Sequence, residues 1–211
     1  MSSKKVLVIL SDANSFPLHN AGADGETVQQ PSGFFLMELA KPLQKLLDAG
    51  YEVTRENGFG RPRRFRDVPD EELRGFAGVF VPGGHAPLAD LGAAPELGRI
   101  LAHFHAARKP TAAICHGPYA FLSTKHGPGK DFAYRGYRLT SWSDAEEKVM
   151  ETVLRGEIDK VESSLRESGA EMVEGLGEKA GAITVDREVV TGGNPMAADA
   201  LGNKFLEMLK A

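Results

Sequence analysis

The feature that most constrains the fold is a short apolar run that ends abruptly in the only cysteine of the chain. Residues 111–114 have the composition of a buried strand, and Cys115 and His116 follow directly. Gly117 and Pro118 come next, and proline suits the first turn of a helix. The pattern predicts a sharp strand-to-helix turn, the geometry of a nucleophile elbow, with Cys115 at its apex. The helix dipole should then lower the pKa of the thiol.

Strands and helices are expected to alternate along most of the 211 residues. Strands are predicted at 5–10, 51–54, 76–81, 111–114 and 137–142, with a strand pair at 182–191 that turns at Asp186 and Arg187. Long polar loops are predicted at 11–31 and 55–72. A mostly parallel sheet covered on both faces follows, in a single α/β domain over 1–211. Ligands of such sheets bind beyond the carboxyl ends of the strands, where Cys115 lies.

Capping residues and apolar spacing place the helices. The first is predicted from Ser32, as its cap, to about residue 49, with an inward stripe of Leu36, Leu39, Leu43 and Leu46. Further helices are predicted at 95–107, after Cys115, after Ser143, around 158–165 up to Gly169, and at 196–209. Ser143 and Glu146 have the spacing of a capping box.

Composition narrows the class of protein. A net charge of −4 argues against nucleic-acid binding, which usually needs a basic excess. No apolar run approaches the roughly 18 residues of a membrane span, and the N-terminus lacks a signal-peptide pattern. One cysteine permits no internal disulfide, so we expect a cytoplasmic protein with a free thiol.

Two interpretations are open for each residue of the elbow. Cys115 could be a buried structural thiol or a reactive thiolate, and the elbow setting favours the thiolate. His116 could be a solvent-facing histidine. Alternatively, its backbone N–H donates to an oxyanion, and its imidazole acts as a general base if a carboxylate fixes its tautomer.

A second glycine-rich turn follows the strand at 76–81. Gly83, Gly84 and His85 could form a plain turn, since paired glycines mark many turns. In the functional interpretation these three residues bind substrate, with the Gly84 backbone close to a substrate oxygen and its N–H as a second oxyanion donor. The Cys115 elbow beside it favours that interpretation.

Two glutamates complete the set of candidate residues. Glu38 lies off the leucine stripe and close to Phe34 and Phe35, where an apolar setting should raise its pKa and suit it to acid/base work. The alternative is a solvated helix glutamate. Asp144 and Glu146 are explained by the start of a helix, which leaves Glu147 as a candidate to orient His116.

These motifs together resemble the ThiJ/PfpI superfamily, which has a class I glutamine amidotransferase-like fold. The resemblance rests on the Val81-Pro82-Gly83-Gly84-His85 turn, the Ala113-Ile114-Cys115-His116-Gly117-Pro118 elbow and Glu38. Within it, the chain is similar to the branch of heat-shock chaperones and glutathione-independent glyoxalases. That similarity rests on the histidine after the cysteine, the Ser141–Glu147 segment and the Thr191–Pro195 segment.

The resemblance implies a flavodoxin-like three-layer sandwich and a Cys115–His116–Glu147 triad assisted by Glu38. It also implies a glyoxalase III-type lyase, of the D-lactate dehydratase activity class, that acts on a small dicarbonyl substrate. No metal and no organic cofactor is expected, and the subunits are expected to form a homodimer. One departure concerns the segment from Arg55 to Gly58, where the chain looks shorter than its relatives.

Two other functions remain open. One is an amidase or peptidase of the same fold. The other is a redox sensor or chaperone that uses Cys115 as an oxidisable switch, since an exposed thiol of low pKa would serve that purpose too. A glutamine amidotransferase would need a His-x-Glu triplet after Cys115, and none occurs there.

Overall fold

A computed structural model describes residues 4–21, 24–54, 64–173, 175, 177 and 180–211. The central sheet has the strand order β4-β1-β5-β6-β10-β9. Its strands are β1 (Lys5–Val8), β4 (Glu52–Thr54), β5 (Gly78–Val81), β6 (Thr111–Ile114), β9 (Ile183–Asp186) and β10 (Val189–Gly192). All neighbours pair in parallel except β9 and β10, which form the expected antiparallel pair around Arg187. The mostly parallel α/β architecture is therefore confirmed.

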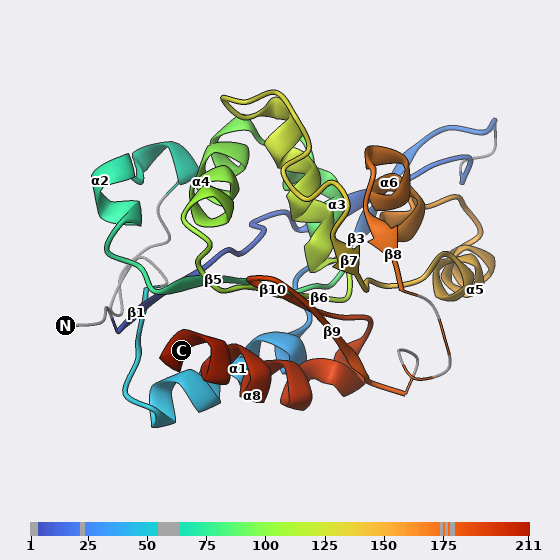
Figure 1. The fold of residues 1–211 in the computed structure, drawn as a ribbon. Helices are drawn as coiled ribbons and strands as arrows, with labels where there is room; N and C mark the ends of the chain where they lie inside the picture. Colours follow the sequence, from blue (N-terminus) through green and yellow to red (C-terminus); the bar gives the residue numbers. More distant parts are fainter. Residues whose placement is uncertain (1–3, 22–23, 55–63, 174, 176, 178–179) are drawn as a thin grey trace.

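Helices cover both faces of this sheet (Figure 1). On one face lie α1 (Leu36–Asp48) and α8 (Ala198–Lys210), which pack against each other. On the other lie α2 (Asp70–Leu73), α4 (Pro95–Ala106) and the 3-10 helix η2 (Gly117–His126). The remaining helices are η1 (Phe65–Asp67), α3 (Pro87–Asp90), α5 (Asp144–Leu154), α6 (Val161–Ser168) and η3 (Pro195–Ala197).

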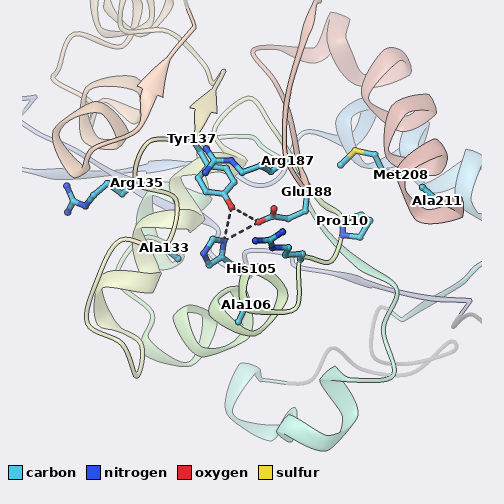
Figure 2. A pocket seen from close by; sticks show the side chains of 11 residues that line it. His105, Ala106, Pro110, Ala133, Arg135, Tyr137, Arg187, Glu188, Met208 and Ala211 are labelled. Atoms are coloured by element: carbon cyan, nitrogen blue, oxygen red, sulfur yellow. Dashed lines mark hydrogen bonds and ion pairs between the residues drawn. The ribbon is translucent and has the colours of Figure 1, made fainter.

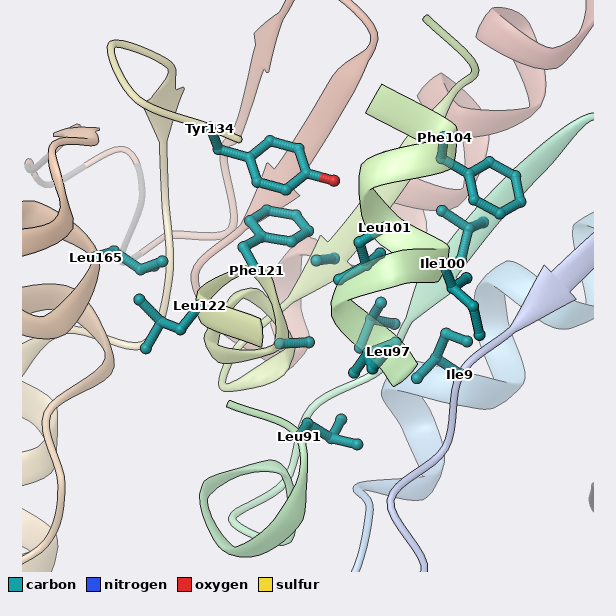
Figure 3. Close-up of a cluster of buried hydrophobic side chains, with 14 of the residues drawn as sticks. Ile9, Leu91, Leu97, Ile100, Leu101, Phe104, Phe121, Leu122, Tyr134 and Leu165 are labelled. Carbon is teal, nitrogen blue, oxygen red and sulfur yellow. The ribbon is translucent and has the colours of Figure 1, made fainter. Parts of the chain in front are cut away.

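The hydrophobic core is divided by the sheet into two clusters. Figure 3 shows the larger one, in which α4 presents Leu97, Ile100, Leu101 and Phe104 to the sheet, as its periodicity predicts. The smaller cluster lies under α1 and α8 and includes Leu39, Leu46 and Cys115. No helix among the described residues is both long and apolar enough to cross a membrane.

Local predictions at helix ends are confirmed where side chains make the cap. The hydroxyl of Ser143 accepts the Glu146 N–H, and the Glu146 carboxyl in turn accepts the Ser143 N–H. Gly169 ends α6 at a φ of 108°, a value that favours glycine. These signals are local, so the sequence alone suffices to find them.

Five predictions of secondary structure are wrong. Among its described residues, the predicted loop 55–72 contains the 3-10 helix η1 and the start of the helix α2. The first helix begins at Leu36 with Phe35 as its cap instead of Ser32, and Leu36 is 67% exposed. The predicted loop 11–31 contains a hairpin of β2 (Ser15–Leu18) and β3 (Val28–Pro31). The predicted strand 137–142 shrinks to β7 (Arg138–Leu139), which pairs with β8 (Glu171–Met172) outside the central sheet.

The fifth concerns the helix expected after Cys115, which is the 3-10 helix η2 rather than an α-helix. The segment from Arg55 to Gly58, where the chain was expected to be shorter than its relatives, lies outside the described residues. The strands β1, β5 and β6 are neighbours in the sheet, so the segments that follow their carboxyl ends lie side by side. The carboxyl ends of β5 and β6 position Gly83 and Cys115 there.

Candidate active site

Cys115 adopts a backbone conformation that residues other than glycine rarely occupy. Its φ is 60°, in the left-handed region, directly after the last residue of β6. The backbone is held on both sides, because the Cys115 N–H donates to Gly192 O at 2.8 Å and Trp142 N–H donates to Cys115 O at 2.9 Å. Strain of this kind concentrates at functional sites, and the turn has the predicted elbow form.

Cys115, His116 and Glu147 form a continuous chain of contacts. His116 Nδ1 lies 3.2 Å from Cys115 Sγ, and His116 Nε2 lies 2.7 Å from Glu147 Oε2. Both His116 and Glu147 are 1% exposed. The structure therefore brings together the three side chains of the predicted triad, while their catalytic roles stay a prediction.

Electrostatic interactions among Cys115, His116 and Glu147 determine which of their atoms carry protons. Burial lowers the pKa of His116, although the hydrogen bond to Glu147 opposes that shift, so the imidazole is neutral near pH 7. Burial would raise the pKa of Glu147, but hydrogen bonds from His116 and His85 outweigh it and lower that pKa to about 2. An ionised carboxylate only accepts hydrogen bonds, so His116 carries its proton on Nε2. The lone pair on Nδ1 then faces the Cys115 sulfur.

Glu38 reaches the same sulfur from α1. Its side chain is fully buried, and Oε2 accepts the Gly83 N–H at 3.1 Å. Burial raises the pKa of Glu38 to about 7, against smaller opposing effects of the Cys115 side chain and the Gly83 N–H. The expected direction is confirmed, but the cause is burial under the sheet rather than two phenylalanine rings, since Phe34 and Phe35 are 41% and 47% exposed.

The expected low pKa of the Cys115 thiol is wrong. Burial raises the pKa of Cys115 well above its ordinary value, and the charge of Glu38 raises it further, while backbone N–H groups of Gly84 and His116 lower it. The sulfur is enclosed, with the residue 5% exposed, and so lacks the solvation that a free thiolate needs. Glu38 and Cys115 therefore behave as a coupled pair that loses its first proton near pH 7.

The glycine turn fits closely around this pair. A Cβ on Gly83 would lie 2.7 Å from both Cys115 Cβ and Glu38 Oε2. Gly84 has a φ of 95°, and a Cβ there would lie 2.4 Å from Gly33 O. Only glycine suits either position, and the N–H groups of Gly84 and His116 both face the sulfur. These are the two N–H groups predicted as oxyanion donors, a role that stays a prediction.

His85 was expected to bind substrate, and the structure gives it a further partner. Its Nε2 lies 3.0 Å from Glu147 Oε1, so one carboxylate receives hydrogen bonds from two imidazoles. The two imidazole rings are 4.1 Å apart between centroids and are flanked by Phe16 at 4.8 Å from His85 and Trp142 at 5.5 Å from His116.

Phe16 and Trp142 were not among the predicted site residues. The Trp142 indole nitrogen is buried without a hydrogen-bond partner among the described residues, so its ring serves the site through stacking. The Ser141–Glu147 segment was a detectable signal for Trp142. Phe16 lies on β2, inside a segment expected to be a loop, and its sequence context offered no such signal.

Three of these side chains are also spaced as metal ligands could be. One ligand atom from each of His85, His116 and Glu147 lies within 4.8 Å of the others. In the structure these atoms instead hydrogen-bond to one another, which accounts for their positions without an ion. The expectation that no metal takes part stays a prediction.

Comparison with known proteins identifies the family. The model of the DJ-1/PfpI family matches residues 27–208. The chain belongs to the DJ-1/PfpI family. This confirms the resemblance to the ThiJ/PfpI superfamily that the elbow, the glycine turn and Glu38 indicated.

Among curated DJ-1/PfpI relatives, the protein/nucleic acid deglycase HchA of Escherichia coli strain SE11 is 32% identical over 162 residues. The match covers 72% of this chain but 54% of HchA, so the chain spans about half the length of that relative. That this chain shares the activity of HchA is therefore a proposal.

Solved structures of the family share the fold. Glyoxalase III from Candida albicans has a TM-score of 0.74 at 18% identity, with 97% of this chain and 96% of that chain covered. The Francisella tularensis Rapid Encystment Protein has a TM-score of 0.73 at 19% identity, with 97% and 98% covered. At these identities the similarity establishes the fold alone.

Proposed function

We propose that the protein is a glutathione-independent glyoxalase that converts methylglyoxal to lactate through Cys115. The observation that carries the proposal is the position of the Cys115 sulfur between two different proton acceptors, His116 Nδ1 and the Glu38 carboxyl. A conversion that moves protons at several successive steps needs such a pair. The names of the relatives, deglycase and glyoxalase III, support the same chemistry.

In the first step, His116 Nδ1 takes the thiol proton as the sulfur attacks the aldehyde carbon. The carbonyl π electrons move to oxygen, and the resulting oxyanion receives hydrogen bonds from the N–H groups of Gly84 and His116. Glu147 stabilises the imidazolium that forms. Return of the proton to the oxyanion gives a neutral hemithioacetal.

In the second step, Glu38 removes the proton from the carbon bonded to sulfur, and the electrons of that C–H bond form the C=C bond of an enediolate. The hydroxyl proton of the hemithioacetal passes to the neighbouring oxygen, the former ketone oxygen. Glu38 then returns its proton to the neighbouring carbon as the first C–O⁻ becomes a carbonyl, which leaves a thioester of lactate. The first carbon is oxidised and the second is reduced, so no external oxidant or reductant is needed. Water hydrolyses the thioester, releases lactate and restores the thiol.

Glu38 suits this step because it is an acid and a base in the same pH range. Its pKa of about 7 makes each protonation state accessible near neutrality. Its Oε1 is buried and has no hydrogen-bond partner among the described residues, so it is available to a substrate.

A second candidate, a deglycase, is favoured by the similarity to HchA. It would use the same attack of Cys115 on a carbonyl-derived carbon, with a protein amine or thiol as the leaving group. The redox-sensor alternative is less well supported, because burial and the raised pKa of Cys115 reduce its thiolate character.

The test is an assay of lactate from methylglyoxal without glutathione. The unmodified protein should produce lactate, and Cys115→Ser should lose turnover by at least about 10³-fold. Glu71→Gln, which changes an exposed glutamate, is a control that should retain activity. Turnover that survives in Cys115→Ser would contradict the proposal.

The deglycase candidate is separated by its substrate. If the protein is a deglycase, it should regenerate N-acetyl-lysine from a sample pretreated with methylglyoxal faster than the adduct releases methylglyoxal spontaneously. Removal of free methylglyoxal by the protein should not be able to explain that faster rate. If the repair rate equals the spontaneous rate, the glyoxalase alone explains the data.

A further inference from the structure

A cavity lies at the end of the sheet opposite to Cys115. Its volume is about 900 Å³, within the range of small-molecule sites. Pro110 and Glu188, which line it, come directly before β6 and β10, whereas Cys115 and the Gly192 carbonyl that holds it lie at the other ends of these strands. The cavity is therefore separate from the candidate active site.

The floor of this cavity is a preformed polar cluster (Figure 2). The Tyr137 hydroxyl donates to Glu188 Oε1 at 2.8 Å, and His105 Nδ1 lies 3.1 Å from the same oxygen. Glu188 and Tyr137 are buried. Both contacts involve the same oxygen, so the Glu188 carboxylate is held in place by protein groups.

Three arginines from separate segments line the same cavity. Arg108 follows α4, Arg135 precedes β7, and Arg187 lies in the turn between β9 and β10. Against these three arginines the lining contributes one acidic side chain, that of Glu188. The rest of the lining includes the apolar side chains of Pro110 and Met208.

The arginines differ in how far they are already engaged. Arg187 pairs with Asp186 at 2.8 Å and lies 3.4 Å over the Tyr137 ring, so it is held in place. Arg135 makes a longer contact of 3.5 Å with Asp131, and both side chains are exposed. Arg108 makes no ion pair with any residue that the structure describes, which leaves its guanidinium available.

We propose that this cavity binds a small organic anion, a carboxylate or a phosphate monoester attached to an apolar body. Guanidinium groups match the oxygens of both anions with paired hydrogen bonds, and Arg108 and Arg135 would supply them. The apolar side chains would contact the body of the ligand. The volume admits a ring together with its charged group.

The test is a calorimetric titration of the full chain with benzoate, phenyl phosphate and the neutral analogue benzamide. Both anions should bind saturably and more weakly as salt increases, whereas benzamide should bind at least about tenfold more weakly. The tighter of the two anions identifies the charged group that the cavity prefers. Binding should persist in Cys115→Ser, since that residue lies at the other end of the sheet.

Substitutions locate the site. Arg108→Gln and Arg135→Gln should each weaken benzoate or phenyl phosphate by about fivefold, and the double variant should weaken it further. Arg66→Gln changes an exposed arginine outside the cavity and should leave affinity unchanged. Activity on methylglyoxal should be the same in all of these variants, which keeps the outcome independent of the proposed glyoxalase function.

Three results would overturn the proposal. The first is that neither anion binds saturably, and the second is that benzamide binds as tightly as benzoate. The third is that the double variant binds as tightly as the unmodified protein. Circular dichroism of each variant checks that a loss of binding is not a loss of folding.

Discussion

Glu38 and Glu147 are two buried carboxyl groups on different helices, α1 and α5; Glu38 lies beside the Cys115 sulfur, and Glu147 lies beyond His116. They are 0% and 1% exposed, yet the pKa of Glu38 is raised to about 7 and that of Glu147 is lowered to about 2. Burial disfavours the charge of both. The difference is that Glu147 receives hydrogen bonds from two imidazoles, whereas Glu38 receives the Gly83 N–H.

The comparison shows that burial raises the pKa of both carboxyl groups, and that the number of hydrogen-bond donors determines which of the two can carry a proton near pH 7. A group that remains ionised orients and stabilises its neighbours, whereas one that titrates can transfer protons. The proposed mechanism therefore assigns proton transfer to Glu38 and the positioning of His116 to Glu147.

Glu38→Gln should have the largest effect on turnover. An amide of the same shape cannot accept a proton, so we expect kcat for methylglyoxal to fall by about 10³-fold. The measurement is lactate formation near neutral pH, with Glu71→Gln as the control for a glutamate that lies outside the site. A fall of less than about threefold would assign the proton transfer to another group.

Glu147→Gln should reduce kcat by about 10²-fold, because His116 loses the charge that stabilises its imidazolium. Binding of substrate should change less, since Glu147 is separated from the sulfur by the imidazole. Steady-state kinetics of both glutamine variants test the order. If Glu147→Gln is the more damaging of the two, the assignment of roles is reversed.

The same two variants should have opposite effects on stability. Glu38 has a folded pKa above its ordinary value of 4.5, so its contribution to stability is present below that value and lost as pH rises through about 7. Glutamine cannot ionise, so Glu38→Gln avoids the cost of a buried charge. The variant should be more stable than the unmodified protein by about 2 kcal/mol at about pH 8, and by a smaller amount at about pH 5.

For Glu147 the sign is reversed. Its lowered pKa contributes stability above the ordinary value, which is lost as pH falls toward about 2. Glu147→Gln should therefore destabilise the protein at about pH 8. Urea unfolding of both variants at the two pH values measures the difference, and two shifts of the same sign would contradict the comparison.

His85→Gln should have the smallest effect, a reduction in kcat of about threefold. Glu147 would lose one of its two imidazole donors, and the pKa of His116 should rise because the charge of His85 lowers it. Trp142 is the only tryptophan and stacks on His116, so its fluorescence should report this titration.

The midpoint of the fluorescence change should move to higher pH in His85→Gln and remain in place in His126→Gln, an exposed histidine. A midpoint that does not move would mean that His85 has no electrostatic effect on His116.

The sequence allowed the elbow to be predicted because its signals are local. An apolar run followed by Cys115, His116, Gly117 and Pro118 favours a strand that ends in a sharp turn. The capping box at Ser143 and the turn at Arg187 were predictable for the same reason. The family resemblance then identified Glu38 and Glu147 as partners of the cysteine.

The protonation of the site could not be predicted, because it depends on contacts between distant segments. The prediction of a low pKa for Cys115 took into account only the helix that follows it. Burial and the carboxyl of Glu38, on α1, raise that pKa instead. The hydrogen bond from His85 to Glu147 joins residues 62 positions apart. Burial of this kind is a property of packing and leaves no pattern in the local sequence.

The most direct test of the account is an infrared titration of the carboxyl groups. The account predicts that one buried carboxylic acid loses its proton with a midpoint near pH 7 and that this signal is missing in Glu38→Gln. Glu147→Gln should keep the signal. If every carboxyl group titrates below about pH 5, or if the signal near pH 7 persists in Glu38→Gln, then Glu38 is not the proton carrier of this site.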